Sequence, residues 1–273
     1  MNYGEAMEPK VKQESNEKQE TNVSTFVKVG IVVLSIIMII GFGIKVLPSA
    51  ITVTNVSSKR DLPIYCVNTE ENEVALSFDT AWGNEDINKI LDILSEHNVK
   101  GTFFVTGEFV NNYPEDVKAI VAAGHDLGNH SENHKQMSQL TREQCTDEIM
   151  KAHNRVKELT GIEMNLFRPP YGDYNNTLMQ VSRECGYYTI QWDINSMDWK
   201  DYGTENIINT VVNNKHLDNG SIILLHNGAK YMPDALGTII VSLRNKGYDL
   251  VPISKLIYTG DYAVDQTGRQ FER

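Results

Sequence analysis

The fold is decided by the stretch VALSFDTAWGNEDINKILDILSEHNVKGTFFV, residues 74–105. It begins with an apolar run at 74–78 and ends with a second at 102–105, and each run has the length of a buried strand. Between the runs, apolar residues recur at the helical spacing i, i+3, i+4 and i+7, at Ile87, Ile90, Leu91 and Leu94. A strand, a helix and a strand in this order predict two parallel neighbours in one sheet, because a helical crossover returns the chain in the same direction.

The same alternation continues along the chain. Further strand-like runs lie at residues 125–128, 165–167, 188–192, 221–225 and 248–251. Helical patterns separate most of them, and Thr141 with Gln144 predicts a capping box at one helix start. The sequence therefore predicts an α/β fold in which about seven parallel strands form a distorted (β/α) barrel.

The first 70 residues differ in composition from the rest. Residues 1–25 are polar and mixed in charge, which predicts a disordered cytoplasmic tail. Residues 26–47 are almost wholly apolar, with Lys28 and Lys45 near the edges, and predict a single transmembrane helix that acts as a signal anchor. The alternative is a cleavable signal peptide, against which the long polar segment before the apolar run argues.

This reading predicts a single-pass protein of the cell membrane with its folded domain outside the cytoplasm. Residues 48–70 would form an extracellular tether, residues 71–260 the folded domain, and residues 261–273 a polar C-terminal tail. The formal net charge of −11 makes nucleic acid a poor partner, whereas a neutral glycan remains compatible with it.

Two histidines four residues apart, His130 and His134, suggest a metal site. Their imidazoles can bind one divalent ion, although two unrelated surface histidines would give the same spacing. Asp79 directly follows one predicted strand and His226 follows another. Since the chemistry of parallel barrels collects at the carboxyl ends of the strands, the pattern predicts metal-assisted hydrolysis.

Five segments carry a family resemblance. They are LSFD (76–79), HSENH (130–134), RPPYG (168–172), DINSMDW (193–199) and LLH (224–226). In order and spacing they resemble the five motifs of the NodB-like polysaccharide deacetylases, a family of carbohydrate esterase type. Residues 78–85 further resemble a Gram-positive subgroup with peptidoglycan-related and sporulation-associated members. The resemblance covers about residues 71–258 and implies that residues 71–260 are a NodB homology domain.

The resemblance also implies the metal and the base. His130 and His134 would bind a divalent metal, zinc first, with cobalt or another divalent ion as alternatives. Asp79 would be the general base that takes a proton from water. Arg168 would orient this carboxylate and keep it ionised.

The remaining roles lie on the opposite side of the implied site. His226 would be the general acid that protonates the departing amine, and Asp198 would pair with His226 and raise its pKa. The backbone N–H of Tyr171 would bind the oxyanion. The faces of Tyr171 and Trp199 would bind a sugar ring.

One position departs from the family pattern. Thr80 stands where most members carry a second acidic residue that completes the metal ligands. Thr80 itself, Glu85 or Asp86 could supply a replacement ligand, although the start of a helix also favours acids at positions 85 and 86. Asp193 can be read either as a site residue or as a cap on the following loop.

The predicted function is metal-dependent de-N-acetylation of cell-wall glycan, with peptidoglycan N-acetylglucosamine as substrate and acetate as product. The alternatives are an N-acetylmuramic acid deacetylase of the spore cortex and a catalytically weak glycan-binding member in which Thr80 disables the metal site. A glycosidase with Asp79 and Asp198 as its carboxylate pair is a third possibility, but it leaves the two histidines without a role. The expected partners are peptidoglycan or a related acetylated glycan and, through the N-terminal helix, the membrane.

Overall fold

The computed structural model describes Lys28 and residues 60–273. The predicted cytoplasmic tail, the transmembrane segment apart from Lys28, and the tether up to residue 59 lie outside the described residues. Within the described part, no helix combines the length and the apolar character needed to cross a bilayer.

A parallel sheet forms the centre of the domain. Along it, the strands follow the order β6, β5, β4, β3, β2, β8, β7, and β9 pairs with β2 beside this path. Their bounds are β2 (Glu73–Thr80), β3 (Thr102–Val105), β4 (Asp126–Asn129), β5 (Leu166–Phe167), β6 (Tyr188–Thr189), β7 (Ile194–Asn195), β8 (Ile222–His226) and β9 (Asp249–Leu250). All these pairs are parallel, which confirms the predicted α/β class. The described order ends at β6 and β7 without pairing them, so the sheet is a curled, open barrel.

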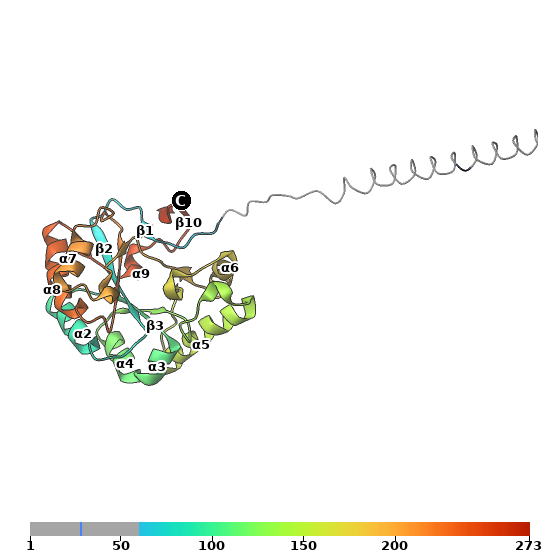
Figure 1. The fold of residues 1–273 in the computed structure, drawn as a ribbon, viewed down its shortest axis with the longest axis horizontal. Helices are drawn as coiled ribbons and strands as arrows, with labels where there is room; N and C mark the ends of the chain where they lie inside the picture. The colour runs from blue at the N-terminus through green and yellow to red at the C-terminus, as the bar shows by residue number, and fades with distance from the viewer. Residues whose placement is uncertain (1–27, 29–59) are drawn as a thin grey trace, which may run out of the picture. The chain divides into compact units, whose positions relative to one another are not determined.

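Helices surround the sheet, as Figure 1 shows. They are α2 (Ile87–Glu96), α3 (Gly107–Asn112), α4 (Pro114–Ala122), α5 (Arg142–Thr160), α6 (Asn176–Glu184), α7 (Thr204–Val212), α8 (Met232–Asn245) and the short α9 (Ile253–Leu256). Three single 3₁₀ turns, η1 (Met137–Gln139), η2 (Pro170–Gly172) and η3 (Asp198–Lys200), lie in the connections. In α2 the four apolar residues of the predicted stripe are the buried ones, so periodicity identified the face that packs on the sheet.

Side chains of β2 divide between the two faces of the sheet. Leu76 and Phe78 belong to the large apolar cluster shared with the helices, whereas Ala75 belongs to a smaller cluster with Phe104. Successive side chains of a strand point to opposite faces, so Ser77 and Asp79 continue the face of Ala75. Residues 77 and 79 thereby place polar atoms inside the barrel, near its carboxyl end.

The predicted capping box is confirmed at the start of α5. The Thr141 hydroxyl accepts the N–H of Gln144, and the Gln144 side chain accepts the N–H of Thr141. At the other end of α5, Gly161 adopts φ 77°, the left-handed conformation that commonly ends a helix. The capping box therefore predicted the start of the longest described helix, and the structure places its end at Gly161.

The two ends of the described domain differ from the prediction. β1 (Cys66–Val67), in the predicted tether, pairs with β11 (Arg269–Glu272), which also pairs antiparallel with β10 (Tyr262–Val264). The predicted polar tail therefore forms a hairpin next to β1, close to the C-terminus marked in Figure 1. Gln270 is fully buried, and its side chain exchanges two hydrogen bonds with the backbone of Tyr258. The prediction of an exposed tail rested on the polar composition of this segment. The Gln270 amide can nevertheless be buried, because its oxygen and its nitrogen both form hydrogen bonds.

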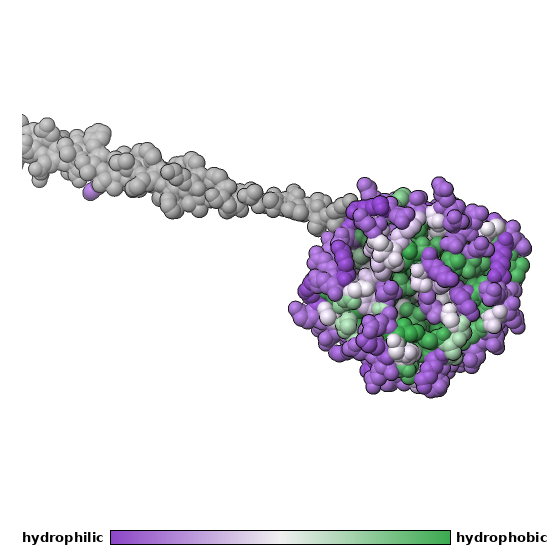
Figure 2. Space-filling view, turned by 180° about the vertical axis from the view of Figure 1, so that it is seen from behind, coloured by the Kyte–Doolittle hydropathy of each residue, from purple (hydrophilic) through white to green (hydrophobic). Residues whose placement is uncertain are grey.

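Figure 2 shows hydrophilic residues around the outline of the domain and hydrophobic residues towards the middle of the visible face.

Candidate active site

Arg168 and Asp79 form a buried ion pair inside the barrel. Arg168 follows β5, and its Nη1 donates to Asp79 Oδ1 at 2.8 Å. Its Nη2 donates to the Ser77 hydroxyl at 2.9 Å and to the Gln191 carbonyl at 3.1 Å. The guanidinium also lies over the ring of Phe104, 4.1 Å from the ring centroid. The Arg168 side chain is completely buried, so these contacts fix both the cation and the carboxylate that it binds.

The electrostatics keep Asp79 ionised. Burial alone would raise the pKa of Asp79, but the neighbouring groups His130 and Arg168 lower it below its ordinary value. Burial also lowers the pKa of His130, so this imidazole is neutral. We therefore assign the lowered pKa of Asp79 to the permanent charge of Arg168. Asp79 can therefore accept a proton at neutral pH.

His130 and His134 direct imidazole nitrogens towards the same region. His130 Nδ1 lies 2.7 Å from the carbonyl of Arg168, which can only accept, so Nδ1 carries the proton. This leaves the Nε2 lone pair free, 3.5 Å from Asp79 Oδ2. The His134 ring lies 4.9 Å from that of His130. Burial lowers the pKa of His134 to about 4, so both rings are neutral near pH 7.

Buried polar groups of β4 and α5 hold the loop that carries the two histidines. Asn129, at the end of β4, accepts the N–H of Ser131, and its amide donates to the carbonyl of Ile149. Glu148 of α5 accepts both the backbone N–H and the side-chain amide of Asn133. These bonds set the conformation in which the loop presents its two rings.

Strained backbone conformations are concentrated in the site loops. Six non-glycine residues of the described part have positive φ, and four of them are Ser131 (66°), His134 (51°), Tyr171 (60°) and Met197 (57°). Each lies in a segment that also carries a predicted site residue. Such conformations cost about 1–3 kcal/mol each and persist only where surrounding contacts enforce them.

His226 and Asp198 form a second pair at the end of β8. Asp198 is completely buried; its Oδ1 lies 2.8 Å from His226 Nδ1, and its Oδ2 accepts the His226 backbone N–H at 2.7 Å. Burial lowers the pKa of His226, but the hydrogen bond and charge of Asp198 outweigh it and raise the pKa above its ordinary value. Asp79 contributes in the same direction, which places the two pairs within electrostatic reach of each other. An ionised carboxylate and a protonatable imidazole thus share one site.

The structure does not provide an acidic replacement for the ligand missing at Thr80. The Thr80 hydroxyl is buried and donates to the carbonyl of Phe78. Glu85 is exposed and accepts the N–H of its neighbour Asn84. Asp86 is the N-cap of α2, but its side chain accepts the N–H of Gly228 instead of capping the helix. In the described part of the chain, no three His, Cys, Asp or Glu side chains converge in a metal-binding arrangement.

The available donors nevertheless fit a divalent ion held by two protein ligands. His130 Nε2 and His134 Nδ1 are both buried, and neither has a hydrogen-bond partner among the described residues. Neutral imidazole nitrogens are preferred zinc ligands, and an ion between them would satisfy both. The other coordination positions would remain for water and substrate.

The predicted aromatic residues lie at this site. Tyr171 is in η2, and its ring contacts that of His134 at a centroid distance of 4.6 Å. Trp199 follows Asp198 in η3, and its N–H donates to Asp198 Oδ1. Both side chains are largely exposed.

Asp193 has a structural role in this fold. Its carboxylate accepts the Ser221 hydroxyl and the N–H of Ile222 at the start of β8. Burial raises the pKa of Asp193 to about 6. Neither reading left open by the sequence describes this role, because the carboxylate binds the start of β8 and not the loop that follows Asp193.

Several supporting residues were not predicted. Ser77, Glu148 and Asn227 hold, respectively, the guanidinium of Arg168, the histidine loop and the loop after β2. Ser77 could have been recognised as the one polar residue within the apolar run 74–78. Glu148 lies in a helix rich in charged residues, so nothing in its sequence context indicated that it is buried.

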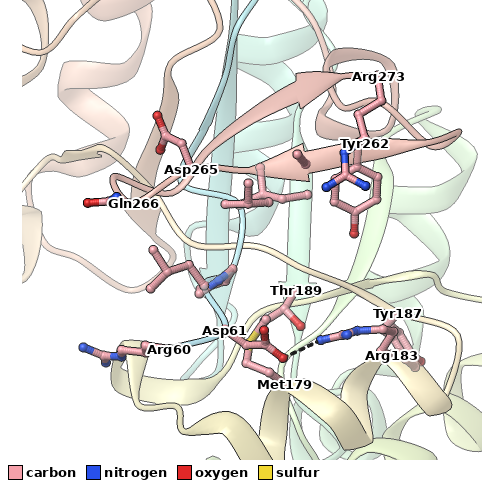
Figure 3. A pocket seen from close by; sticks show the side chains of 15 residues that line it. Arg60, Asp61, Met179, Arg183, Tyr187, Thr189, Tyr262, Asp265, Gln266 and Arg273 are labelled. Carbon is pink, nitrogen blue, oxygen red and sulfur yellow. Dashed lines mark hydrogen bonds and ion pairs between the residues drawn. The ribbon is translucent and has the colours of Figure 1, made fainter. Parts of the chain in front are cut away.

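A separate pocket of about 610 Å³ lies between residues 60–64, α6 and the C-terminal hairpin. Figure 3 shows Arg183 and Asp61 joined by an ion pair at its edge. None of the predicted catalytic or metal-binding residues lines it. We therefore do not assign the chemistry to this pocket.

Comparison with known proteins identifies related sequences. Residues 67–190 match the polysaccharide deacetylase family. The peptidoglycan-N-acetylmuramic acid deacetylase PdaA of Bacillus subtilis is 34% identical over 198 residues, which cover 71% of this chain and 74% of PdaA. A peptidoglycan-N-acetylglucosamine deacetylase of Bacillus cereus is 34% identical over 191 residues, which cover 68% of this chain and 69% of that protein. The chain spans 60% of the length of another relative, the uncharacterized protein YlxY of Bacillus subtilis.

Solved structures give the same fold. BA3943 of Bacillus anthracis, described as a CE4 family pseudoenzyme, matches with a TM-score of 0.68 and 31% identity over 71% of this chain and 68% of that chain. A mutant of BA3943 is described as having restored enzymatic activity. The chain therefore resembles solved structures of peptidoglycan deacetylases, such as PdaA of Bacillus subtilis, as well as that of a pseudoenzyme.

Proposed function

This chain belongs to the polysaccharide deacetylase family, and from that premise we propose that it removes acetyl groups from peptidoglycan N-acetylglucosamine in a metal-dependent reaction. The observation that carries the proposal is the joint position of two pairs. Asp79 is held by Arg168 beside two unpartnered imidazole nitrogens, and His226 is held by Asp198 within electrostatic reach. Amide hydrolysis needs both a base and an acid, and this arrangement supplies them.

The residues divide the reaction between the two sides of the site. His130 and His134 would hold the divalent ion, which supplies polarisation of the acetyl carbonyl and a lower pKa of water. Asp79 takes the proton of the attacking water, while Arg168 prevents the carboxylate from turning away. The Tyr171 N–H donates to the developing oxyanion, a contribution typically of about 3 kcal/mol.

Collapse of the tetrahedral intermediate requires a proton on the sugar nitrogen. The free Nε2 of His226 donates it, because Asp198 occupies Nδ1 and raises the pKa of the ring, which favours its protonated form. Acetate and a free amine on the glycan are the products. N-acetylmuramic acid is the alternative sugar, since relatives of similar identity act on either one.

The test is release of acetate from peptidoglycan by the full-length chain with added Zn²⁺ or Co²⁺. We expect a chelator and His130→Ala each to abolish release, whereas His216→Ala, which changes an exposed histidine, leaves it unchanged. Acetate release that survives both the chelator and His130→Ala would refute the metal-dependent mechanism. New reducing ends without acetate would indicate a glycosidase.

A second candidate is a glycan-binding protein without turnover. Two observations favour it: the missing acidic ligand at Thr80 and the similarity to a pseudoenzyme. Thr80→Asp would add a carboxylate next to the base, so we expect tighter zinc binding by calorimetry. If the native chain binds glycan but releases acetate only as Thr80→Asp, the binding function is the correct one.

The remaining expectations concern location. We propose that residues 26–47 anchor the protein in the cell membrane and that the catalytic domain lies outside the cytoplasm, where peptidoglycan is found. The apolar composition of this segment supports the proposal. Its test is protease accessibility of the domain in intact cells whose wall has been removed: a domain that is digested only after the cells are lysed would contradict it.

A further inference from the structure

Ser131 links the two histidines of the histidine loop, residues 130–134. It has φ 66°, a conformation that residues other than glycine rarely adopt, and its side chain accepts the N–H of His134 at 3.0 Å. The N–H of Ser131 itself donates to Asn129 Oδ1 at 2.9 Å. A rotation of the Asn129 amide would therefore release Ser131 and shift the two imidazole rings relative to each other. The positions of both rings depend on the groups that fix this amide.

A tyrosine hydroxyl helps to fix the orientation of the Asn129 amide, which is completely buried. Its Nδ2 donates to the carbonyl of Ile149 at 2.8 Å and to the hydroxyl oxygen of Tyr187 at 3.0 Å. A carbonyl can only accept, so the amide nitrogen must face these two groups and the amide oxygen must face Ser131. Tyr187, the residue before β6, is itself buried. A side chain far from the histidine loop in sequence thus holds the amide that supports it.

His153 of α5 extends this network. Its Nδ1 lies 2.6 Å from the Tyr187 hydroxyl. Burial raises the pKa of Tyr187, so the hydroxyl keeps its proton, and among the described residues His153 is the acceptor within hydrogen-bond distance of it. His153 Nδ1 therefore accepts, and the proton of the neutral ring lies on Nε2. Donation runs in one direction through the network, from the histidine loop to α5.

The two proposed metal ligands differ in how directly they are held. The carbonyl of Arg168 accepts from the His130 ring and orients it. The His134 ring forms no hydrogen bond to another residue in the described part of the chain, and its contacts are with aromatic rings. Its position is therefore set mainly by its backbone, whose N–H is bound to Ser131. Groups behind a metal ligand commonly determine metal affinity.

We propose that Tyr187 and His153 are positioning residues for the histidine loop, which they hold in place through Asn129. Neither residue belongs to the five sequence motifs, and neither has a role in the proposed proton transfers. The proposal rests on the proposed function, because the loop matters for catalysis only if its two histidines bind the metal. It adds a support that reaches from the half-buried His153 on α5 to the proposed metal ligands.

The first test is zinc binding by the full-length chain, measured by calorimetry. Tyr187→Phe removes the hydroxyl and keeps the ring, and we expect it to raise the Kd for Zn²⁺ about tenfold. His153→Leu should act in the same direction, whereas His153→Asn, which keeps an acceptor close to the position of Nδ1, should retain most of the affinity. Tyr65→Phe is the matched control, since it removes a hydroxyl bonded to that of Tyr174. An unchanged Kd in both Tyr187→Phe and His153→Leu would overturn the inference.

The double variant tests whether the two residues act through one network. Tyr187→Phe combined with His153→Leu should raise the Kd no further than Tyr187→Phe alone, because the first substitution already breaks the connection. Effects of the two substitutions that multiply would mean that they act independently, and would overturn the network. His153→Leu changes a half-buried position, so it provides an answer even if Tyr187→Phe disturbs folding.

Amide hydrogen exchange of the metal-free chain separates this inference from the proposed function. In Tyr187→Phe the N–H groups of Ser131 and His134 should exchange at least about fivefold faster, while the amides of β3 keep their rates. This result in a chain that neither binds zinc nor releases acetate would refute the metal-dependent mechanism and leave the positioning role intact. Equal acceleration in the histidine loop and in β3 would show a general loss of stability and overturn the inference, as would unchanged exchange in the loop.

Discussion

Arg168 is a fully buried cation, and its burial has a large electrostatic consequence for stability. A fully buried guanidinium loses its hydration, and its bonds to Asp79, Ser77 and the Gln191 carbonyl, together with the contact with the Phe104 ring, compensate for that loss. Removal of either partner of such a pair leaves an unpaired buried charge. Removal of both can cost much less.

The first prediction concerns this pair. Arg168→Met should lower the free energy of unfolding by about 3–5 kcal/mol. Adding Asp79→Asn should restore at least ~1 kcal/mol, because neither charge is then left alone. Urea unfolding of the two single variants and the double variant measures the coupling. Arg183→Met, which breaks an exposed pair with Asp61, should cost less than ~1 kcal/mol. Strictly additive losses at 79 and 168 would contradict the argument.

The second prediction concerns the pH dependence of the proposed reaction. His226 must be protonated to act as an acid, so activity should fall as the pH rises through its raised pKa. Asp198→Asn removes the charge that raises this pKa, and the alkaline limb of kcat/KM should move to lower pH by about one unit. Asp193→Asn is the matched control, since this buried carboxylate binds Ser221 and Ile222 instead of His226. An unmoved limb in Asp198→Asn would exclude the pairing role.

At the scale of elements, long periodic helices and apolar strands were predictable from the sequence. The apolar stripe of α2 and the cap of α5 follow from local spacing alone. β7 was missed because only two residues pair, and α3 because six residues are too few for a periodic pattern. The C-terminal hairpin depends on pairing with β1, some 200 residues earlier in the chain, a distance that no local signal covers.

The third prediction concerns the start of α5, the helix that supplies Glu148. Thr141→Ala removes the acceptor for the Gln144 N–H and should destabilise the domain by about 1 kcal/mol. Thr146→Ala removes a hydroxyl inside the same helix that only bonds back to the Arg142 carbonyl, and should change stability by less than ~0.5 kcal/mol. Chemical denaturation compares the two. Equal effects would mean that the cap does not limit this helix.

The candidate site was predictable to a different degree. The motif order identified the two pairs, and the structure places Asp79, Arg168, His130 and His134 together, with His226 bound to Asp198. The polar groups that support them were not predictable. Their partners, such as Glu148 for Asn133, are defined by the tertiary fold and not by sequence spacing.

At the scale of the described domain, its N-terminal and C-terminal segments pack against each other. β1 and the C-terminal hairpin form one small sheet, and Ile64 and Val67 of the entering segment are buried in the cluster that contains Phe104. The C-terminal residues are therefore part of the packed domain. The predicted polar tail, by contrast, would make no packing contacts and would not contribute to the stability of the domain.

The fourth prediction follows. Deletion of residues 261–273 should lower the free energy of unfolding by at least ~2 kcal/mol, because the buried bonds of Gln270 to Tyr258 and the ladder to β1 are lost. Thermal unfolding of the truncated and full-length chains measures this. Arg273→Ala, which removes only an exposed side chain, is the control. An unchanged melting temperature after deletion would support the tail reading.

The left-handed backbone at Ser131, His134, Tyr171 and Met197 sets stability against activity in this domain. If these loops adopted unstrained conformations, the folded state would become more stable. The side chains of the site would then no longer lie in their present positions relative to one another. Selection for thermal stability alone would therefore favour substitutions in these loops before substitutions in the strands of the barrel. Among variants selected in this way, those with substitutions at these four positions should have the highest melting temperatures and the lowest activities.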